Sequence, residues 1–226
     1  MQADLGVDQR LLGGGDGRLV LGDDLQHRGG IHGTLHQRQR DRTVLTTSTD
    51  APKGTGALDL HTTSAADKVA CGNEVDFKDL LVKDLGTVAY DVYTTGENSA
   101  LGNNMPSITF EIDPNVKTIN ADYSSLVYLP SNSESNKWTH IDATADNGKN
   151  WGLTGAKFDD TKCSINKTRC TWKEIVDYLG DGDDDAKVIS AGISKGRDYA
   201  FSGAVDLLQF GGKTYDFEPQ GVLEVK

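Results

Sequence analysis

The chain has 226 residues, a formal net charge of −11 and 36% hydrophobic residues. The negative balance argues against a nucleic-acid partner and against an anionic membrane surface, because both attract cationic proteins. No apolar run reaches the roughly 18 residues that a membrane helix needs, so the sequence predicts no membrane insertion. A chain of this length is expected to form one or two domains with a sizeable core.

Residues 1–53 differ from the rest of the chain. Every aromatic residue lies between Phe77 and Phe217, and the first lysine is Lys53, whereas arginine, glycine and histidine are frequent before it. So few large apolar groups cannot offset the entropy of ordering a chain. The segment is therefore predicted to be either disordered or spurious, meaning translated from a wrong start or in a shifted frame. A β-sandwich domain is predicted over residues 54–226.

The first residues also lack the pattern of a signal peptide, which is a basic region followed by an uninterrupted apolar stretch. Taken literally, this indicates a cytoplasmic protein. If residues 1–53 are spurious, the leader of the natural protein is missing from the sequence instead.

Short alternating segments follow from residue 57 onwards. Apolar residues at every second position place one face of a strand on a core and the other in water, and Gly211-Gly212 is typical of a two-residue hairpin. Many short strands of this kind predict an all-β fold, a jelly-roll-like antiparallel β-sandwich. The predicted strands are 57–62, 88–93, 107–112, 123–129, 139–143, 188–193, 204–210, 213–217 and 222–225.

One short helix is predicted over about residues 171–179. Thr171 and Glu174 have the spacing of a capping box, and Gly180 stands where a helix stops. Four apolar side chains at helical spacing then share one face: Trp172, Ile175, Val176 and Leu179.

The three cysteines favour one disulfide. Cys163 and Cys170 flank a short loop just before the predicted helix, which leaves Cys71 without a predicted partner. A disulfide fits an oxidising compartment. A zinc site is not favoured, because no CxxC pair or paired histidines accompany these thiols.

Several segments, taken in their order over about residues 54–219, resemble a large group of uncharacterised secreted bacterial domains. The resemblance implies an exported jelly-roll-like module that is extracellular or at the cell surface, with no established catalytic residues. Two departures are the irregular segment 71–74, where a strand is usual, and the region before residue 54. The segments that carry the resemblance include Gly54-Thr-Gly-Ala-Leu-Asp-Leu60, Tyr90-Asp-Val-Tyr93, Thr171-Trp172, Val205-Asp206 and Tyr215-Asp-Phe-Glu-Pro219.

Enzyme motifs are weak. Gly192-Ile-Ser-Lys-Gly196 fits the string GxSxG, but no histidine follows His140 to complete a hydrolase triad. A polysaccharide-degrading enzyme needs two carboxyl groups facing each other across a glycosidic bond, and a sequence does not show such a pair. The acidic residues considered are Glu111, Asp113, Asp142, Asp206 and Asp216 at strand ends, together with Asp91 and Glu97.

Calcium is the cofactor that the sequence suggests, if the protein has one. Asp181, Asp183 and Asp185 concentrate carboxylates just after the predicted helix, and calcium takes oxygen ligands of this kind. The spacing does not match an EF-hand loop, and a solvated acidic turn is the alternative.

The predicted ligand-binding residues are aromatic. Trp151, in the polar loop 146–152, is expected to be the most exposed ring, with Trp138, Tyr199 and Tyr128 as further candidates. The leading function is therefore a non-catalytic extracellular binding module for a polysaccharide or a cell-surface glycan. The alternative is a structural or adhesive module of a bacterial surface protein, and the third hypothesis is a polysaccharide-degrading enzyme. Because the chain stops within a predicted strand, a fragment of a longer protein is also expected.

Overall fold

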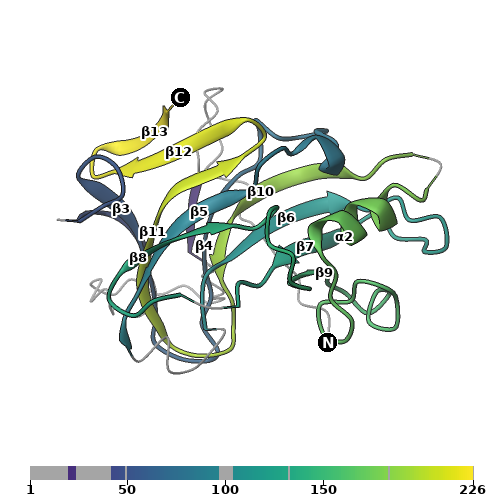
Figure 1. Cartoon of the computed structure of the whole chain (residues 1–226), viewed down its shortest axis with the longest axis horizontal. Coiled ribbons are helices and arrows are strands. Elements are labelled where there is room, and N and C mark those ends of the chain that lie inside the picture. Colours follow the sequence, from purple (N-terminus) through teal and green to yellow (C-terminus); the bar gives the residue numbers. More distant parts are fainter. Residues whose placement is uncertain are drawn as a thin grey trace, which may run out of the picture.

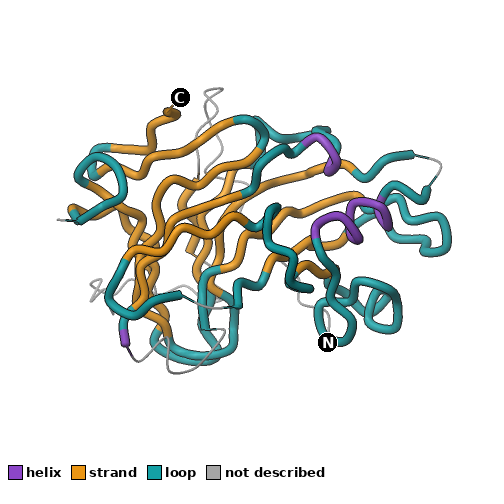
Figure 2. Tube along the Cα trace, viewed as in Figure 1, coloured by secondary structure: helices purple, strands orange, loops and turns teal. Residues whose placement is uncertain are grey.

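The computed structural model describes residues 20–23, 42–48, 50–96, 104–131, 133–182 and 184–225. Strands dominate these residues, as Figure 2 shows, and they form two antiparallel sheets (Figure 1). The prediction of an all-β sandwich with a short helix is confirmed.

The first sheet, sheet A, holds six strands of the described chain. Three of them lie outside the predicted strands: β1 (Val20–Asp23), β4 (Val69–Asn73) and β9 (Trp151–Leu153). Strand β4 nevertheless alternates, with Val69, Cys71 and Asn73 buried, whereas β9 occupies the end of a segment that reads as a polar loop. In order across the sheet the strands are β1 (Val20–Asp23), β4 (Val69–Asn73), β10 (Lys187–Lys195), β6 (Ser107–Asp113), β7 (Ser124–Tyr128) and β9 (Trp151–Leu153).

Sheet B holds seven strands of the described residues. Gly211 and Gly212 join β11 to β12 with φ angles of 61° and 75°, so the predicted two-residue hairpin is confirmed. The path of the sheet is β13 (Gly221–Val225), β12 (Lys213–Glu218), β11 (Phe201–Phe210), β3 (Gly56–Thr62) and β2 (Arg42–Thr47), and β5 (Ala89–Thr94) pairs with both β11 and β8 (Trp138–Asp142).

Strand β11 changes neighbours along one of its edges. Phe201–Val205 pair with β3, whereas Leu208–Phe210 pair with β12. Asp206 and Leu207 lie between the two pairings, and a register shift interrupts the pairing with β5 at the same place. Leu207 has a φ of 49°, which marks a local irregularity of the strand. We call this point, at residues 206–207, the fork.

The core lies between the two sheets and is rich in aromatic rings. Phe110 of β6 packs edge-on against Phe210 of β11 with ring centroids 5.6 Å apart, and Phe77 packs against Phe210 at 4.7 Å. All three rings are almost completely buried. Burying such a side chain contributes about 1.5–3 kcal/mol, so these contacts bind sheet A to sheet B.

The helix α2 (Trp172–Leu179) confirms the predicted helix. Thr171 and Glu174 form the expected capping box, and Ile175 and Leu179 are buried. The ring of Trp172 lies 4.7 Å from that of Trp151, so α2 packs beside β9 at one end of sheet A (Figure 1). A short 3-10 helix, η2 (Val82–Asp84), contacts α2.

Two described strands precede residue 54. β1 pairs with β4 and β2 pairs with β3, and the N–H of Ser48 donates to the carbonyl oxygen of Thr55 across the β2–β3 connection at 2.8 Å. The rest of the segment 1–53, apart from Ser48 and residues 50–53, lies outside the described residues. A domain boundary at residue 54 stays a prediction.

Candidate functional site

Trp151 belongs to the core, so the prediction that its ring is exposed is wrong. The side chain is 0% exposed, and its indole Nε1 donates to the carbonyl oxygen of Ala143 at 3.0 Å. The polar residues before it form a loop, but Trp151 is the first residue of β9 and faces inward. A ring in this position cannot stack on a ligand from solvent.

Of the two candidate tyrosines, Tyr128 is buried and Tyr199 is exposed. Tyr128 is 2% exposed and packs on Trp151 with ring centroids 5.1 Å apart, so the structure brings these two candidates together inside the core. Tyr199 is 53% exposed on the turn between β10 and β11. Tyr199 is therefore accessible to a ligand, whereas Tyr128 is not.

Trp138 lies on the outer face of sheet B beside a second aromatic ring. It is directly opposite Tyr93 in the β5–β8 register, and the two ring centroids are 5.8 Å apart with an interplanar angle of 56°. Both side chains are partly exposed. The residues that alternate with Tyr93 on β5 are Tyr90 and Val92, which are fully buried, so the Tyr93–Trp138 pair faces away from the core.

A polar pair adjoins these rings on the same face. Asp91 and His140 are opposite each other in the same register, two residues from Tyr93 and Trp138. The Nδ1 atom of His140 lies 3.2 Å from the Oδ1 atom of Asp91, and the side chains are 63% and 12% exposed. Two partly exposed rings, an exposed imidazole and the largely buried carboxyl group beside it thus form one surface, which we call the sheet B site: Tyr93, Trp138, Asp91 and His140.

Among these four residues, sequence reasoning identified Trp138 as a ligand-binding candidate and Asp91 only as one of several acidic candidates. The alternation of β5 and β8 predicts which residues share a face, but the pairing of the two strands depends on their register. Tyr93 and Trp138 are 45 positions apart in the chain, so no local pattern relates them. The available signal was that aromatic and polar residues occupy the predicted solvent faces of these two strands.

The disulfide and the remaining cysteine are structural. Cys163 and Cys170 are joined in a disulfide, and Cys170 exchanges two backbone hydrogen bonds with Trp151. The bridge thereby holds the loop before α2 against the edge strand β9. Cys71 is free and buried, and burial raises the pKa of its thiol to about 12, which makes it unreactive.

The acidic turn after α2 shows no assembled metal site. The Oδ2 atom of Asp185 lies 2.6 Å from the Nζ atom of Lys83, Asp181 is exposed, and Asp183 lies outside the described residues. In the part of the chain that the structure describes, no three Asp, Glu, His or Cys side chains are grouped as metal ligands. The calcium hypothesis for this turn therefore gains no support.

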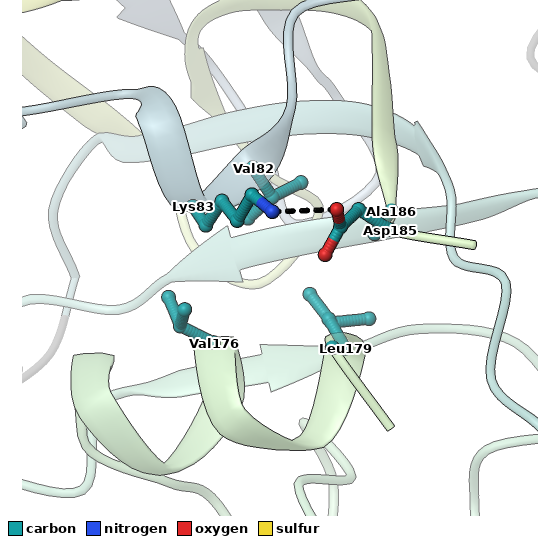
Figure 3. Close-up of a pocket in the computed structure, with 7 residues that line it drawn as sticks. Val82, Lys83, Val176, Leu179, Asp185 and Ala186 are labelled. Carbon is teal, nitrogen blue, oxygen red and sulfur yellow. Dashed lines mark hydrogen bonds and ion pairs between the residues drawn. The ribbon is translucent and has the colours of Figure 1, made fainter. Parts of the chain in front are cut away.

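A small cavity lies beside this turn, between α2 and η2 (Figure 3). Its volume of about 40 Å³ has room for a few water molecules. Val82, Val176 and Leu179 give it apolar walls, and the Lys83–Asp185 ion pair crosses its rim in Figure 3. The cavity is too small for a sugar ring.

The GxSxG string does not lie at a nucleophile elbow. Gly192–Gly196 runs through the end of β10, and the next element is strand β11 instead of the helix that a nucleophile elbow requires. Glu111 accepts hydrogen bonds from Tyr123 and from Ser125 on the outer face of sheet A. Glu111, one of the acidic candidates, is therefore part of a local cluster of hydrogen-bonded polar side chains.

Buried carboxyl groups gather at the fork. Asp206 is 0% exposed, Asp216 is 3% exposed and Glu218 is 5% exposed. Burial, together with the nearby charge of Asp216, raises the pKa of Asp206 to about 6. Burial also raises the pKa of Asp216, and the charge of Glu218 adds to this rise.

Comparisons of the chain with protein-family models, curated proteins and solved structures find no match. No helix in the described ranges has the length and apolar character needed to cross a membrane.

Proposed function

We propose that the protein is a non-catalytic extracellular binding module that recognises a polysaccharide or a cell-surface glycan at the sheet B site. The observation that carries this proposal is the accessible Tyr93–Trp138 pair, whose rings lie 5.8 Å apart on the solvent face of two paired strands.

The chemistry of the sheet B site suits a sugar. A pyranose presents apolar C–H groups on its faces and hydroxyl groups at its edges. Aromatic rings supply large apolar area with few rotatable bonds and attract the C–H groups through their negative faces. Asp91 and His140 stand beside the rings, where an acceptor and an imidazole can bond the hydroxyl groups.

The location on sheet strands favours binding over catalysis. Side chains on paired strands are held at fixed spacing, so a rigid ligand can bind without ordering a loop first. The Cys163–Cys170 disulfide supports an extracellular location, because such bonds persist in oxidising compartments.

Affinity electrophoresis of the full chain tests the proposal. The gels would contain soluble plant, fungal or bacterial polysaccharides, and release of reducing sugar would be measured in parallel. We expect one polymer to retard the protein without being degraded. Trp138→Ala should abolish the retardation, because it removes half of the aromatic pair.

Tyr199→Ala is the matched control, because it removes an exposed aromatic ring from outside the sheet B site. This variant should migrate like the wild-type protein in the same gel. Retardation lost equally in both variants would place the ligand elsewhere. No retardation by any polymer would contradict the proposal and favour a structural or adhesive module of a surface protein.

A further inference from the structure

Two carboxylate oxygens at the fork are buried without a partner. Asp206 and Asp216 are 0% and 3% exposed, and neither the Oδ2 atom of Asp206 nor the Oδ1 atom of Asp216 has a hydrogen-bond partner. Leaving one oxygen of a buried carboxyl group without a hydrogen-bond partner costs free energy, and costs more when the group is charged. Native proteins rarely leave such an atom unpaired without a reason.

A backbone hydrogen bond holds the side chain of Asp206 in place at the fork. The Oδ1 atom of Asp206 accepts a hydrogen bond from the backbone N–H of Phe217 at 3.0 Å. This bond joins β11 to β12 just where their ladder stops, and Asp216 is the residue next to Phe217. The charge of Asp216 acts on Asp206, so the two carboxyl groups belong to one electrostatic cluster.

The third carboxyl group at the fork has a different role. Glu218 accepts hydrogen bonds from the N–H and from the hydroxyl group of Thr55, both at 2.9 Å. It therefore fastens the β2–β3 connection over the fork. Its negative charge is still close enough to raise the pKa of Asp216, while Lys53 lowers it.

Negative charge thus exceeds positive charge around two buried oxygen atoms that have no hydrogen-bond partner. Lys53 is exposed, so its ammonium group is solvated and compensates the buried charge weakly. The arrangement is one that a bound cation completes. Both carboxyl groups are already buried, so the free energy of removing them from water is a cost of folding and is not incurred again when an ion binds.

We propose that the fork binds a calcium ion, with Asp206 and Asp216 as its carboxylate ligands. Calcium takes about six to eight oxygen ligands and accepts backbone carbonyl oxygens and water among them. Because no three acidic, histidine or cysteine side chains are grouped in the described ranges, backbone carbonyl oxygens and water would supply the ligands beyond these two carboxylates. With so few charged ligands, the dissociation constant is expected near the 10⁻⁴ to 10⁻³ M of extracellular modules.

Thermal unfolding of the full chain tests the proposal. The protein would be stripped with EDTA, dialysed, and unfolded at pH 7 with calcium chloride, with magnesium chloride, or with sodium chloride at equal ionic strength. Saturating calcium should raise the unfolding midpoint of the wild-type protein by about 2 to 8 °C. Magnesium should raise it less, because magnesium keeps its water and demands octahedral geometry.

Substitutions locate the ion. Asp216→Asn and Asp206→Asn should each abolish the calcium-dependent rise. Asp181→Asn should retain it, since Asp181 lies in the acidic turn after α2, apart from the fork. Equilibrium dialysis with radioactive calcium should find one ion on the wild-type chain that the Asp216→Asn chain lacks.

Three outcomes would overturn the proposal. The first is an unfolding midpoint of the wild-type protein that calcium leaves unchanged. This test does not depend on whether any variant folds. The second is a calcium effect that Asp216→Asn retains. The third is an effect that Asp181→Asn removes, which would assign the ion to the acidic turn.

Discussion

At the scale of single residues, Asp146 organises the loop that precedes β9. Its Oδ2 atom accepts hydrogen bonds from the hydroxyl of Tyr128 and from the side-chain amide of Asn150, both at 2.7 Å, and its Oδ1 atom accepts one from the N–H of Gly148 at 2.7 Å. Burial raises the pKa of Asp146, but these hydrogen bonds lower it by more, so the net shift is downward. The carboxylate thereby fixes the loop that leads into Trp151.

Asp146→Asn should lower the free energy of unfolding by about 1–2 kcal/mol at pH 7, because charge-assisted hydrogen bonds are lost. A carboxyl group whose pKa is lowered on folding stabilises the protein above its ordinary pKa of 3.8, and loses this contribution as the pH falls through the folded value. Urea unfolding at several pH values between 3 and 7 should therefore show the wild type and the variant converging at the acid end. The exposed Asp122→Asn is the control, and a difference independent of pH would contradict the assignment.

Gly54 is required by the contact between the β2–β3 connection and Glu218. It has a φ of +63°, and a Cβ atom there would lie 1.4 Å from the Oε1 atom of Glu218. Glu218 is 5% exposed and bonded to Thr55, so it cannot move aside without losing both bonds. Residues 54–56 thus pack closely against residues 217–219, although the two segments are far apart in the chain.

Gly54→Ala should destabilise the protein more than Gly86→Ala does. Gly86 has nearly the same φ, +67°, but a Cβ atom there would meet nothing within 4 Å. Both variants incur the conformational cost of about 1 kcal/mol, and Gly54→Ala should lose a further 1–3 kcal/mol, roughly, with the Thr55–Glu218 bonds. Urea unfolding of the two variants would measure this difference directly. Equal losses would show that Glu218 adapts freely.

At the scale of elements, alternation and capping chemistry predicted most of the fold. The helix was predicted because Thr171 and Glu174 satisfy its first amides and its apolar face is regular. Strand β9 was missed because its three residues, Trp151–Leu153, are all buried and show no alternation. Strand β4 was missed because Cys71-Gly72-Asn73 lacks the β-branched and aromatic residues that favour strands.

The candidate sites were less predictable than the elements. Trp138 was identified from its aromatic character, but its partner Tyr93 follows from a register that no local pattern specifies. Asp206 and Asp216 read as ordinary residues of strand ends. Their burial results from β11 changing neighbours at the fork, and such a change depends on how three strands meet.

At the scale of the whole molecule, residues before position 54 and residues near the C-terminal end complete sheet B. β2 pairs with β3 from Arg42↔His61 to Thr47↔Gly56. The adjoining Lys53 backbone contributes to the environment of Asp206 at the fork, since its amide lowers the pKa of that carboxyl group. At the other end, Glu218 of β12 holds Thr55. The residues just before position 54 therefore take part in the sheet that the predicted domain needs.

A chain that starts at residue 54 should consequently be less stable than one that starts at residue 42. The shorter chain loses β2, which leaves one edge of β3 with unpaired backbone groups, and it loses the Ser48–Thr55 hydrogen bond. An open strand edge also invites pairing between molecules. Urea unfolding should give a lower free energy for 54–226 than for 42–226, and light scattering should show self-association of the shorter chain at high concentration. Equal stability and monomeric behaviour of both chains would instead support a domain boundary at residue 54, because the pairing of β2 would then contribute nothing measurable to the fold.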